Sequence, residues 1–205
     1  SYKDEVLPGT AIVDIEKLEA LTPNNLLEML FYQPQEEKQG SRVVKLKLFH
    51  VGDPIHLSDV LPMLENFGLR VIGESPYAVK TSTDETYWIL DFSMLLTGDG
   101  EFNLEIVQHF FQDAFAKVWA GGLEDDGFNR LILGAELGGR EVSIIRAFAK
   151  YERQIGGTFS QRYIENTFAR YPNIAKLLIQ LFKTRFDPKI HAKAKSAEKT
   201  LITVK

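Results

Sequence analysis

The sequence predicts an α+β fold, in which a unit of strands and helices is followed by an all-helical region. Apolar and polar residues alternate over 42–50, which is typical of a half-buried strand. Apolar residues recur at helical spacing over 104–120, which is typical of a helix with one buried face. No strand pattern follows residue 129, so the rest of the chain is predicted to be helical.

The first predicted strand and its helix occupy residues 42–68. The strand separates two sets of side chains, Val44, Leu46 and Leu48 on one side and Lys45 and Lys47 on the other. A turn follows, after which Ser58 is the expected N-cap of a helix and Gly68 its C-terminal stop.

Two further strands and a long helix are expected next. Residues 69–80 form one strand, in which Pro76 indicates an edge position or a bulge. Residues 86–92 form another, and Asn103 is the expected cap of a helix that reaches Ala120.

The resulting order is strand, helix, strand, strand, helix, which is five of the six elements of a ferredoxin-like, ACT-like unit with an antiparallel sheet. We expect residues 26–32 to supply the missing strand, beside residues 42–50. Before it, residues 11–21 read as a short amphipathic helix with Ile12, Ile15 and Leu18 on its apolar side.

The helical region is expected to contain several well-marked helices. The helix at 140–155 carries one apolar stripe, formed by Ile144, Phe148, Tyr151 and Ile155. Ser160 is the expected N-cap of the next helix, with Phe159 and Ile164 as a hydrophobic staple. Pro172 then begins another helix.

These patterns divide the chain into four parts. They are an N-terminal helix with an extra strand (1–41), an ACT-like domain (42–122), a helical region (123–188) and a basic tail, helical or disordered (189–205). The tail has a net charge of +4 and no stop signal, which suggests that the sequence continues beyond it.

The composition excludes several classes of protein. The 205 residues are 44% hydrophobic and 25% charged, with no cysteine and a net charge of −4. We therefore expect a cytoplasmic globular protein without disulfides or thiolate metal sites. The acidic balance argues against nucleic-acid binding, and the apolar runs are too short to span a membrane.

No motif points to catalysis, to a cofactor or to a metal. No strand is followed by a phosphate-binding or dinucleotide-binding glycine pattern, and residues 134–139 (GAELGG) read as a corner between helices. His50 and His56 flank Asp53, but too few ligands are present for a zinc site. His109 lies among phenylalanines, where packing is the simpler role.

The acidic residues allow two interpretations. Glu124, Asp125 and Asp126 precede a helix, where acids commonly serve as caps, although paired carboxylates can also act in acid–base chemistry. Asp91 lies between apolar strand residues and needs a cationic partner if it is buried, for which Arg42 or Arg70 are candidates. The predicted structural polar cluster is Asp91, Asp125, Asp126 and Arg130.

Several ordered strings resemble a known family. They are LSDVLPMLENFGLRV (57–71), WILDF (88–92), GLEDDGFNRLIL (122–133), REVSIIRAFAKYERQ (140–154), FSQRYIENTF (159–168) and LFKTRFDP (181–188). Together they resemble the large bacterial type of NAD-dependent glutamate dehydrogenase. The resemblance implies an ACT-like unit and the start of a helical region within a longer enzyme that uses NAD. It carries over no catalytic residue and no cofactor to this segment.

Three functions follow as hypotheses. The first is a non-catalytic regulatory or assembly segment of such an enzyme, whose partners are other domains of the same chain and further copies in a homo-oligomer. The second is a stand-alone sensor of an amino-acid effector, with Gly52, Asp53 and His56 in the ligand loop. The third is a structural interaction segment without a ligand.

Overall fold

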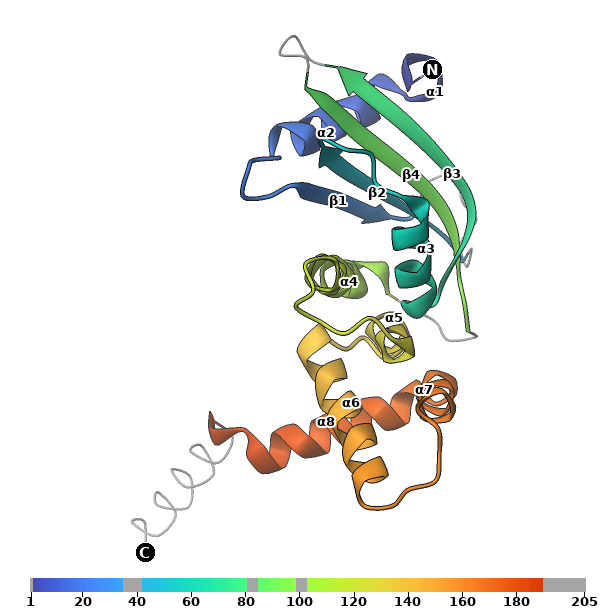
Figure 1. Cartoon of the computed structure of the whole chain (residues 1–205), viewed down its shortest axis with the longest axis vertical. Helices are drawn as coiled ribbons and strands as arrows, with labels where there is room; N and C mark the ends of the chain where they lie inside the picture. Colours follow the sequence, from blue (N-terminus) through green and yellow to red (C-terminus); the bar gives the residue numbers. More distant parts are fainter. Residues whose placement is uncertain (1, 35–41, 81–84, 99–102, 190–205) are drawn as a thin grey trace, which may run out of the picture.

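The computed structural model describes residues 2–34, 42–80, 85–98 and 103–189. His191 and the rest of the predicted tail after Lys189 lie outside these residues. The described part contains a four-stranded antiparallel sheet and, beyond it, a helical region (Figure 1), so the α+β prediction is confirmed. No helix in this part is long and apolar enough to cross a bilayer.

The elements follow the predicted order. They are α1 (Tyr2–Glu5), α2 (Pro8–Glu19), β1 (Leu27–Tyr32), β2 (Val43–Val51), α3 (Leu57–Asn66), β3 (Leu69–Lys80), β4 (Thr86–Leu96), α4 (Leu104–Trp119), η1 (Gly127–Asn129), α5 (Arg130–Gly134), α6 (Gly139–Gln154), α7 (Gln161–Arg170) and α8 (Pro172–Phe186).

The sheet has the order β1-β2-β4-β3. β1 pairs antiparallel with β2, with Met29 opposite Leu48, which confirms that residues 26–32 supply the fourth strand. β3 lies at the other edge, as Pro76 indicated, and its register with β4 shifts between Val71 and Gly73. The N-terminal strand thus fills the place that a sixth, C-terminal element would otherwise take.

The main core lies between one face of the sheet and helices α3 and α4. Leu46, Leu48 and Phe92 on the strands are fully buried there. On α4, the Phe111 ring lies 4.3 Å from that of Phe31 and 5.1 Å from that of Phe67. The phenylalanines of this helix differ in burial: Phe111 and Phe115 are buried, whereas Phe110 is only partly covered.

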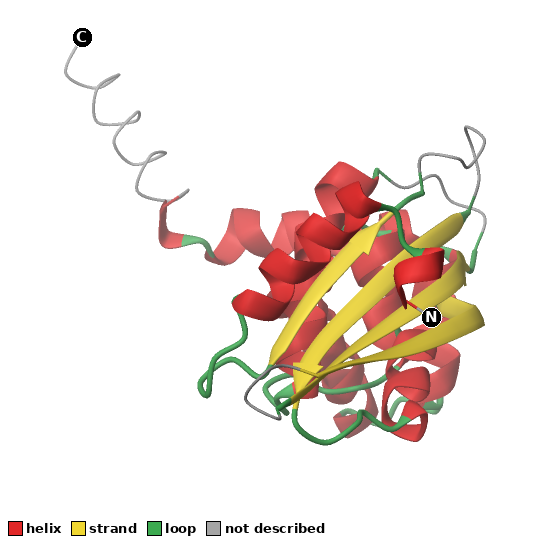
Figure 2. Cartoon of the chain, turned by 90° about the horizontal axis from the view of Figure 1, so that it is seen from above, coloured by secondary structure: helices red, strands yellow, loops and turns green. Residues whose placement is uncertain are grey.

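Helix α2 covers the opposite face of the sheet (Figure 2), and the prediction of its buried side was wrong. Ile12 and Ile15 are 60% and 52% exposed, whereas Asp14 is fully buried. The reason is Lys47 on β2, whose Nζ lies 2.6 Å from Asp14 Oδ2. A buried ammonium requires a counter-ion, and this requirement outweighs the exposure of two isoleucines. Tyr2 also donates a hydrogen bond to Asp14 Oδ2, at 2.6 Å.

Asp91 lies on this same outer face and is mostly buried. Its partner is Lys45 of β2, with 3.4 Å between Lys45 Nζ and Asp91 Oδ2, and neither Arg42 nor Arg70 was the correct candidate. The two residues occupy neighbouring strands on one face, because Lys47 and Asp91 are register partners and Lys45 is two residues along β2.

In the helical region, the apolar stripe predicted on α6 is not the buried side of the helix. Val142, Ile145, Arg146 and Ala149 are buried, while Phe148, Tyr151 and Ile155 are 42%, 60% and 67% exposed. The helix is turned so that Arg146 reaches the segment before α5, where it finds its partners. The helix–helix corner at 134–139 is confirmed, since α5 ends at Gly134 and α6 begins at Gly139.

The cap predictions were mostly correct. Asn103 accepts a hydrogen bond from the Glu105 amide, and Ser160 accepts one from the Tyr163 amide. Ser58 does not cap α3, which begins after His56 without a side-chain cap. Phe159 stacks on Tyr163, at 4.9 Å between ring centroids.

The buried pair predicts a large effect of removing one charge. Asp14→Ala leaves the Lys47 ammonium buried without its counter-ion, so we expect unfolding free energy to fall by about 3 kcal/mol. Urea unfolding followed by tryptophan fluorescence measures this loss. Asp113→Ala is the matched control, because Asp113 pairs with Lys117 on the surface of a helix, and we expect a change within about 0.5 kcal/mol. Equal losses in the two variants would contradict the assignment.

Candidate functional site

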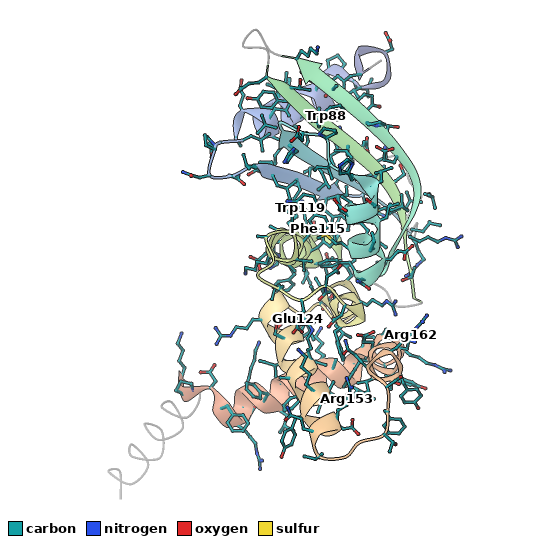
Figure 3. The ribbon with its side chains drawn as sticks, viewed as in Figure 1. Trp88, Phe115, Trp119, Glu124, Arg153 and Arg162 are labelled. Carbon is teal, nitrogen blue, oxygen red and sulfur yellow. The ribbon has the colours of Figure 1, made fainter. Side chains whose placement is uncertain are left out.

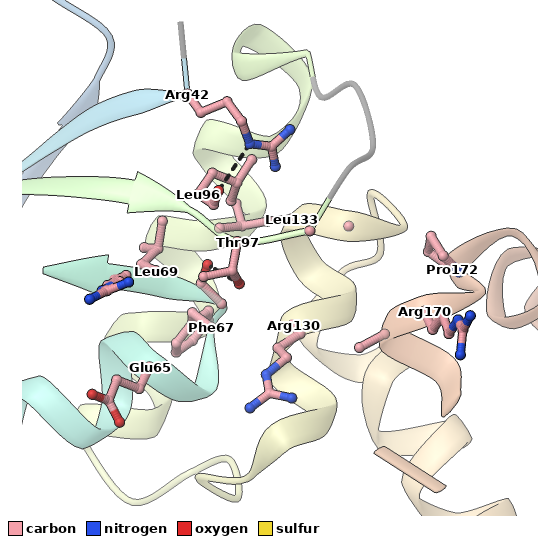
Figure 4. Close-up of a pocket in the computed structure, with 15 residues that line it drawn as sticks. Arg42, Glu65, Phe67, Leu69, Leu96, Thr97, Arg130, Leu133, Arg170 and Pro172 are labelled. Carbon is pink, nitrogen blue, oxygen red and sulfur yellow. Dashed lines mark hydrogen bonds between the residues drawn. The ribbon is translucent and has the colours of Figure 1, made fainter. Parts of the chain in front are cut away.

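A cavity of about 780 Å³ opens where the sheet meets the helical region (Figure 4). Its polar lining consists mainly of Arg42, Arg70, Arg130 and Arg170, with Glu65 as the carboxylate. Apolar side chains form the rest, among them Phe67, Leu69, Leu96, Leu133 and Pro172. We call this feature the arginine cavity.

The wall of the arginine cavity depends on Gly68. This residue has a φ of +82° and ends α3, as predicted. A Cβ on Gly68 would lie 3.2 Å from Thr97 Oγ1 and 3.4 Å from Arg130 Cγ. Thr97 donates hydrogen bonds to the Gly68 carbonyl from its amide (2.8 Å) and from its hydroxyl (2.7 Å). A residue without a side chain therefore lets α5 approach the end of the sheet.

Three of the arginines make contacts with neutral groups. Arg130 Nη1 donates a 3.0 Å hydrogen bond to Asn166 Oδ1 on α7. The Arg170 guanidinium lies 5.6 Å from the centroid of the Tyr171 ring. Arg42 Nε donates to the Leu96 carbonyl at 3.0 Å. The contacts of Arg130 and Arg170 orient the two side chains and leave their positive charges in place.

Beside the cavity, a buried polar cluster centres on Arg146 of α6. Arg146 donates to both oxygens of Asp126, at 2.7 and 2.8 Å, and to Asn129 Oδ1 at 3.0 Å. Its Nε also lies 2.9 Å from Glu124 Oε2. Asn129 in turn donates to the Glu124 carbonyl. The bidentate geometry suits the planar guanidinium, so the cluster ties residues 124–129 to α6.

Glu124 lies at the surface end of this cluster, where the sheet unit meets the helical region (Figure 3). Lys150 donates it a hydrogen bond, at 2.5 Å from Nζ to Oε1. This hydrogen bond, with the nearby positive charges of Arg146 and Lys150, lowers the pKa of Glu124. Both Glu124 and Asp126 bind cationic side chains, and Asp126 also accepts a hydrogen bond from the Phe128 amide.

The four residues of the predicted polar cluster lie in four different places. Asp126 binds Arg146, Asp125 accepts a 3.0 Å hydrogen bond from Asn66, and Arg130 lines the arginine cavity. Asp91 lies on the outer face of the sheet. The buried position of Arg146 was not predicted. Its spacing from Val142, Ile145 and Ala149 places an arginine on an apolar face of the helix, and this pattern indicates a partly buried charged side chain.

The predicted ligand loop lies at the other end of α3, about 15 Å along the helix from the arginine cavity. Gly52 has a φ of +98° and its carbonyl accepts a 2.9 Å hydrogen bond from Trp88 Nε1. Asp53 and His56 are exposed. Gly52, Asp53 and His56 thus lie in the short loop between β2 and α3, and their role as a ligand site stays a prediction.

Two features bear on metal and dinucleotide binding by the residues that the structure describes. No three histidine, aspartate or glutamate side chains of this part gather as metal ligands. The described strands are all antiparallel, whereas a dinucleotide fold uses parallel strands with a glycine-rich turn.

The Arg146 cluster predicts that lysine is a poor substitute for this arginine. Arg146→Lys keeps the charge but loses the bidentate bond to Asp126 and the bond to Asn129, so we expect a loss of about 3 kcal/mol in unfolding free energy. Urea unfolding checks this value. Arg153→Lys, on the exposed side of the same helix, is the control, for which we expect a change within about 0.5 kcal/mol. A loss no larger than that of the control would exclude the proposed role of Arg146.

His50 predicts a pH dependence of stability. Burial lowers the pKa of His50, against a smaller opposing effect of Asp53. The unfolded chain then binds a proton more readily than the folded one, so stability should fall as the pH drops below about 6.5, the ordinary histidine value. Urea unfolding at pH 5 to 8 measures the slope. His50→Gln should reduce the slope and the exposed His56→Gln should not; the reverse pattern would refute the assignment.

Comparisons with known proteins identify the family to which this chain is similar. The model of the glutamate dehydrogenase ACT3 domain matches residues 26–107, helical motif 3 matches residues 123–188 and helical motif 2 matches residues 1–21.

Three NAD-specific glutamate dehydrogenases are similar to the chain. The one from Halomonas elongata is 47% identical over 92% of this chain, that from Pseudomonas aeruginosa 40% over 90%, and that from Mycobacterium tuberculosis 33% over 92%. The chain spans only 11–12% of the length of these relatives. It belongs to the glutamate dehydrogenase family, in which it corresponds to the ACT3 domain and to parts of the flanking helical motifs.

Proposed function

We propose that this chain is a non-catalytic regulatory and assembly segment of an NAD-dependent glutamate dehydrogenase. The whole enzyme would convert L-glutamate and NAD to 2-oxoglutarate, ammonium and NADH in glutamate catabolism. The names of the relatives support this reaction for the longer protein. A cytoplasmic location and membership of a homo-oligomer belong to the same proposal.

The observation that carries the assembly role is an apolar surface on the helical region. On α8, Ile174, Leu177, Leu181 and Phe186 are 51%, 62%, 57% and 64% exposed. On α6, Phe148, Tyr151 and Ile155 form a second exposed stripe. Phe182 connects the two stripes, because its ring lies 6.0 Å from that of Phe148 and 4.9 Å from that of Phe186. Exposed apolar surface of this extent is typical of a face that packs against another protein surface.

The arrangement of the described residues supports a regulatory role. Contacts of α3 with η1, and of α4 with α5 and α6, join the sheet unit to the helical region, so a ligand bound at the sheet unit would bear on the same helices that carry the apolar stripes. The proposed ligands are small effectors of the ACT type, such as amino acids at the loop of Gly52, Asp53 and His56.

The assembly role is tested in the full-length enzyme that contains this chain. Leu177→Glu combined with Leu181→Glu places two charges on the exposed stripe of α8, and we expect loss of the assembled enzyme on size-exclusion chromatography with light scattering. Gln180→Glu is the control, because Gln180 is also exposed on α8 but lies off the stripe, and it should assemble normally. Normal assembly of the double variant would contradict the proposal.

The non-catalytic role has its own measurement. The 205-residue chain should form no NADH from glutamate and NAD, whereas the full-length enzyme should. NADH formation by the isolated chain would refute this part of the proposal, whatever the outcome of the assembly experiment.

A further inference from the structure

We propose that the arginine cavity binds a small organic polyanion, a phosphate ester or a polycarboxylate, through Arg70, Arg130 and Arg170. The inference goes beyond the proposed function, because binding at this cavity would exist whether or not it changes enzyme activity. It also concerns a different place from the predicted effector loop at the other end of α3.

Charge is the first argument. Four arginines line the cavity against one glutamate, Glu65. Arg70, Arg130 and Arg170 form no ion pair with any carboxylate of the residues that the structure describes. Arg146, a short distance away on α6, is by contrast saturated by Asp126 and Glu124. The three cavity arginines therefore retain a positive charge that an anion would neutralise.

The origin of the arginines is the second argument. Arg70 lies at the start of β3, Arg130 at the start of α5 and Arg170 at the end of α7. The close-up shows Arg42, Arg130 and Arg170 placed around the cavity rather than along one surface (Figure 4). Guanidinium groups bind carboxylate and phosphate oxygens through paired N–H donors, so a ligand with several anionic groups can engage more than one of them.

Preorganisation is the third argument. Arg130 is half-buried and is held by Asn166, and Arg170 lies over the ring of Tyr171. Both contacts restrict a long side chain without cancelling its charge. A ligand would then lose less side-chain entropy on binding than it would at freely moving surface arginines.

The apolar lining favours an organic ligand over a simple inorganic ion. Ala169 and Pro172 are partly exposed apolar side chains at the cavity wall, and Phe67 and Leu69 lie buried behind it. The volume of about 780 Å³ lies within the usual range of small-molecule sites. A phosphate or carboxylate group at the arginines would leave room for an organic body against these residues.

The test is calorimetric titration of the full-length protein that contains this chain, at low salt, with ATP, pyrophosphate and citrate as separate probes. We expect saturable binding that weakens as salt is added. Arg70→Gln combined with Arg170→Gln should weaken this binding about tenfold. Both residues are exposed, so the folded structure should tolerate the change, and circular dichroism verifies that it does.

The matched control is Arg162→Gln. Arg162 is exposed on the same helix as Arg170 (Figure 3) and does not line the cavity, so binding should remain unchanged. Arg130→Gln provides a second loss of affinity at the half-buried position. Weakening with ATP and pyrophosphate alone would identify a phosphate ester, and weakening with citrate alone would identify a polycarboxylate.

Two results would overturn the proposal. The first is the absence of any binding that the Arg70 and Arg170 substitutions weaken. The second is an equal effect of Arg162→Gln, which would show general attraction of anions to the surface. Neither result would bear on the assembly of the full-length enzyme, so the inference and the proposed function can fail separately.

Discussion

The contact between Arg146 and Asp126 is the interaction on which the packing of the helical region depends. A buried guanidinium must be surrounded by acceptors, and here they all come from residues 124–129 and α6 itself. This requirement sets the rotation of α6, and with it the exposure of Phe148, Tyr151 and Ile155. One charged side chain therefore determines both how α6 packs against residues 124–129 and which apolar surface the helix presents.

The sheet is organised by a second buried charge. Lys47 lies in the central strand β2, on the face opposite the main core, and its pairing with Asp14 holds α2 against that face. Helix α2 has few buried apolar contacts of its own, so the ion pair specifies its position. The N-terminal part of the chain is thus attached twice, through the hydrogen bonds of β1 and through Asp14.

The arginine cavity has a separate origin. It exists because Gly68 ends α3 with a positive φ, because α5 approaches that point, and because α7 closes the side. The four arginines come from four separate segments, and no stretch of the sequence shows them as a group. A cationic site can therefore form in a chain whose net charge is −4.

Much of the fold followed from the sequence alone, because strand alternation, caps and turn residues are local signals. The alternation of Val44, Leu46 and Leu48, the cap at Asn103 and the stop at Gly68 each depend on neighbouring residues, and each was correctly predicted. The sequence also determined the family, through ordered strings along most of the chain. Tertiary structure alone decided which sides of α2 and α6 are buried, since Asp14 and Arg146 turn inward to partners that are distant in sequence. A buried charge must find its counter-charge wherever the fold places it, and the hydrophobic pattern of one helix holds no record of that requirement.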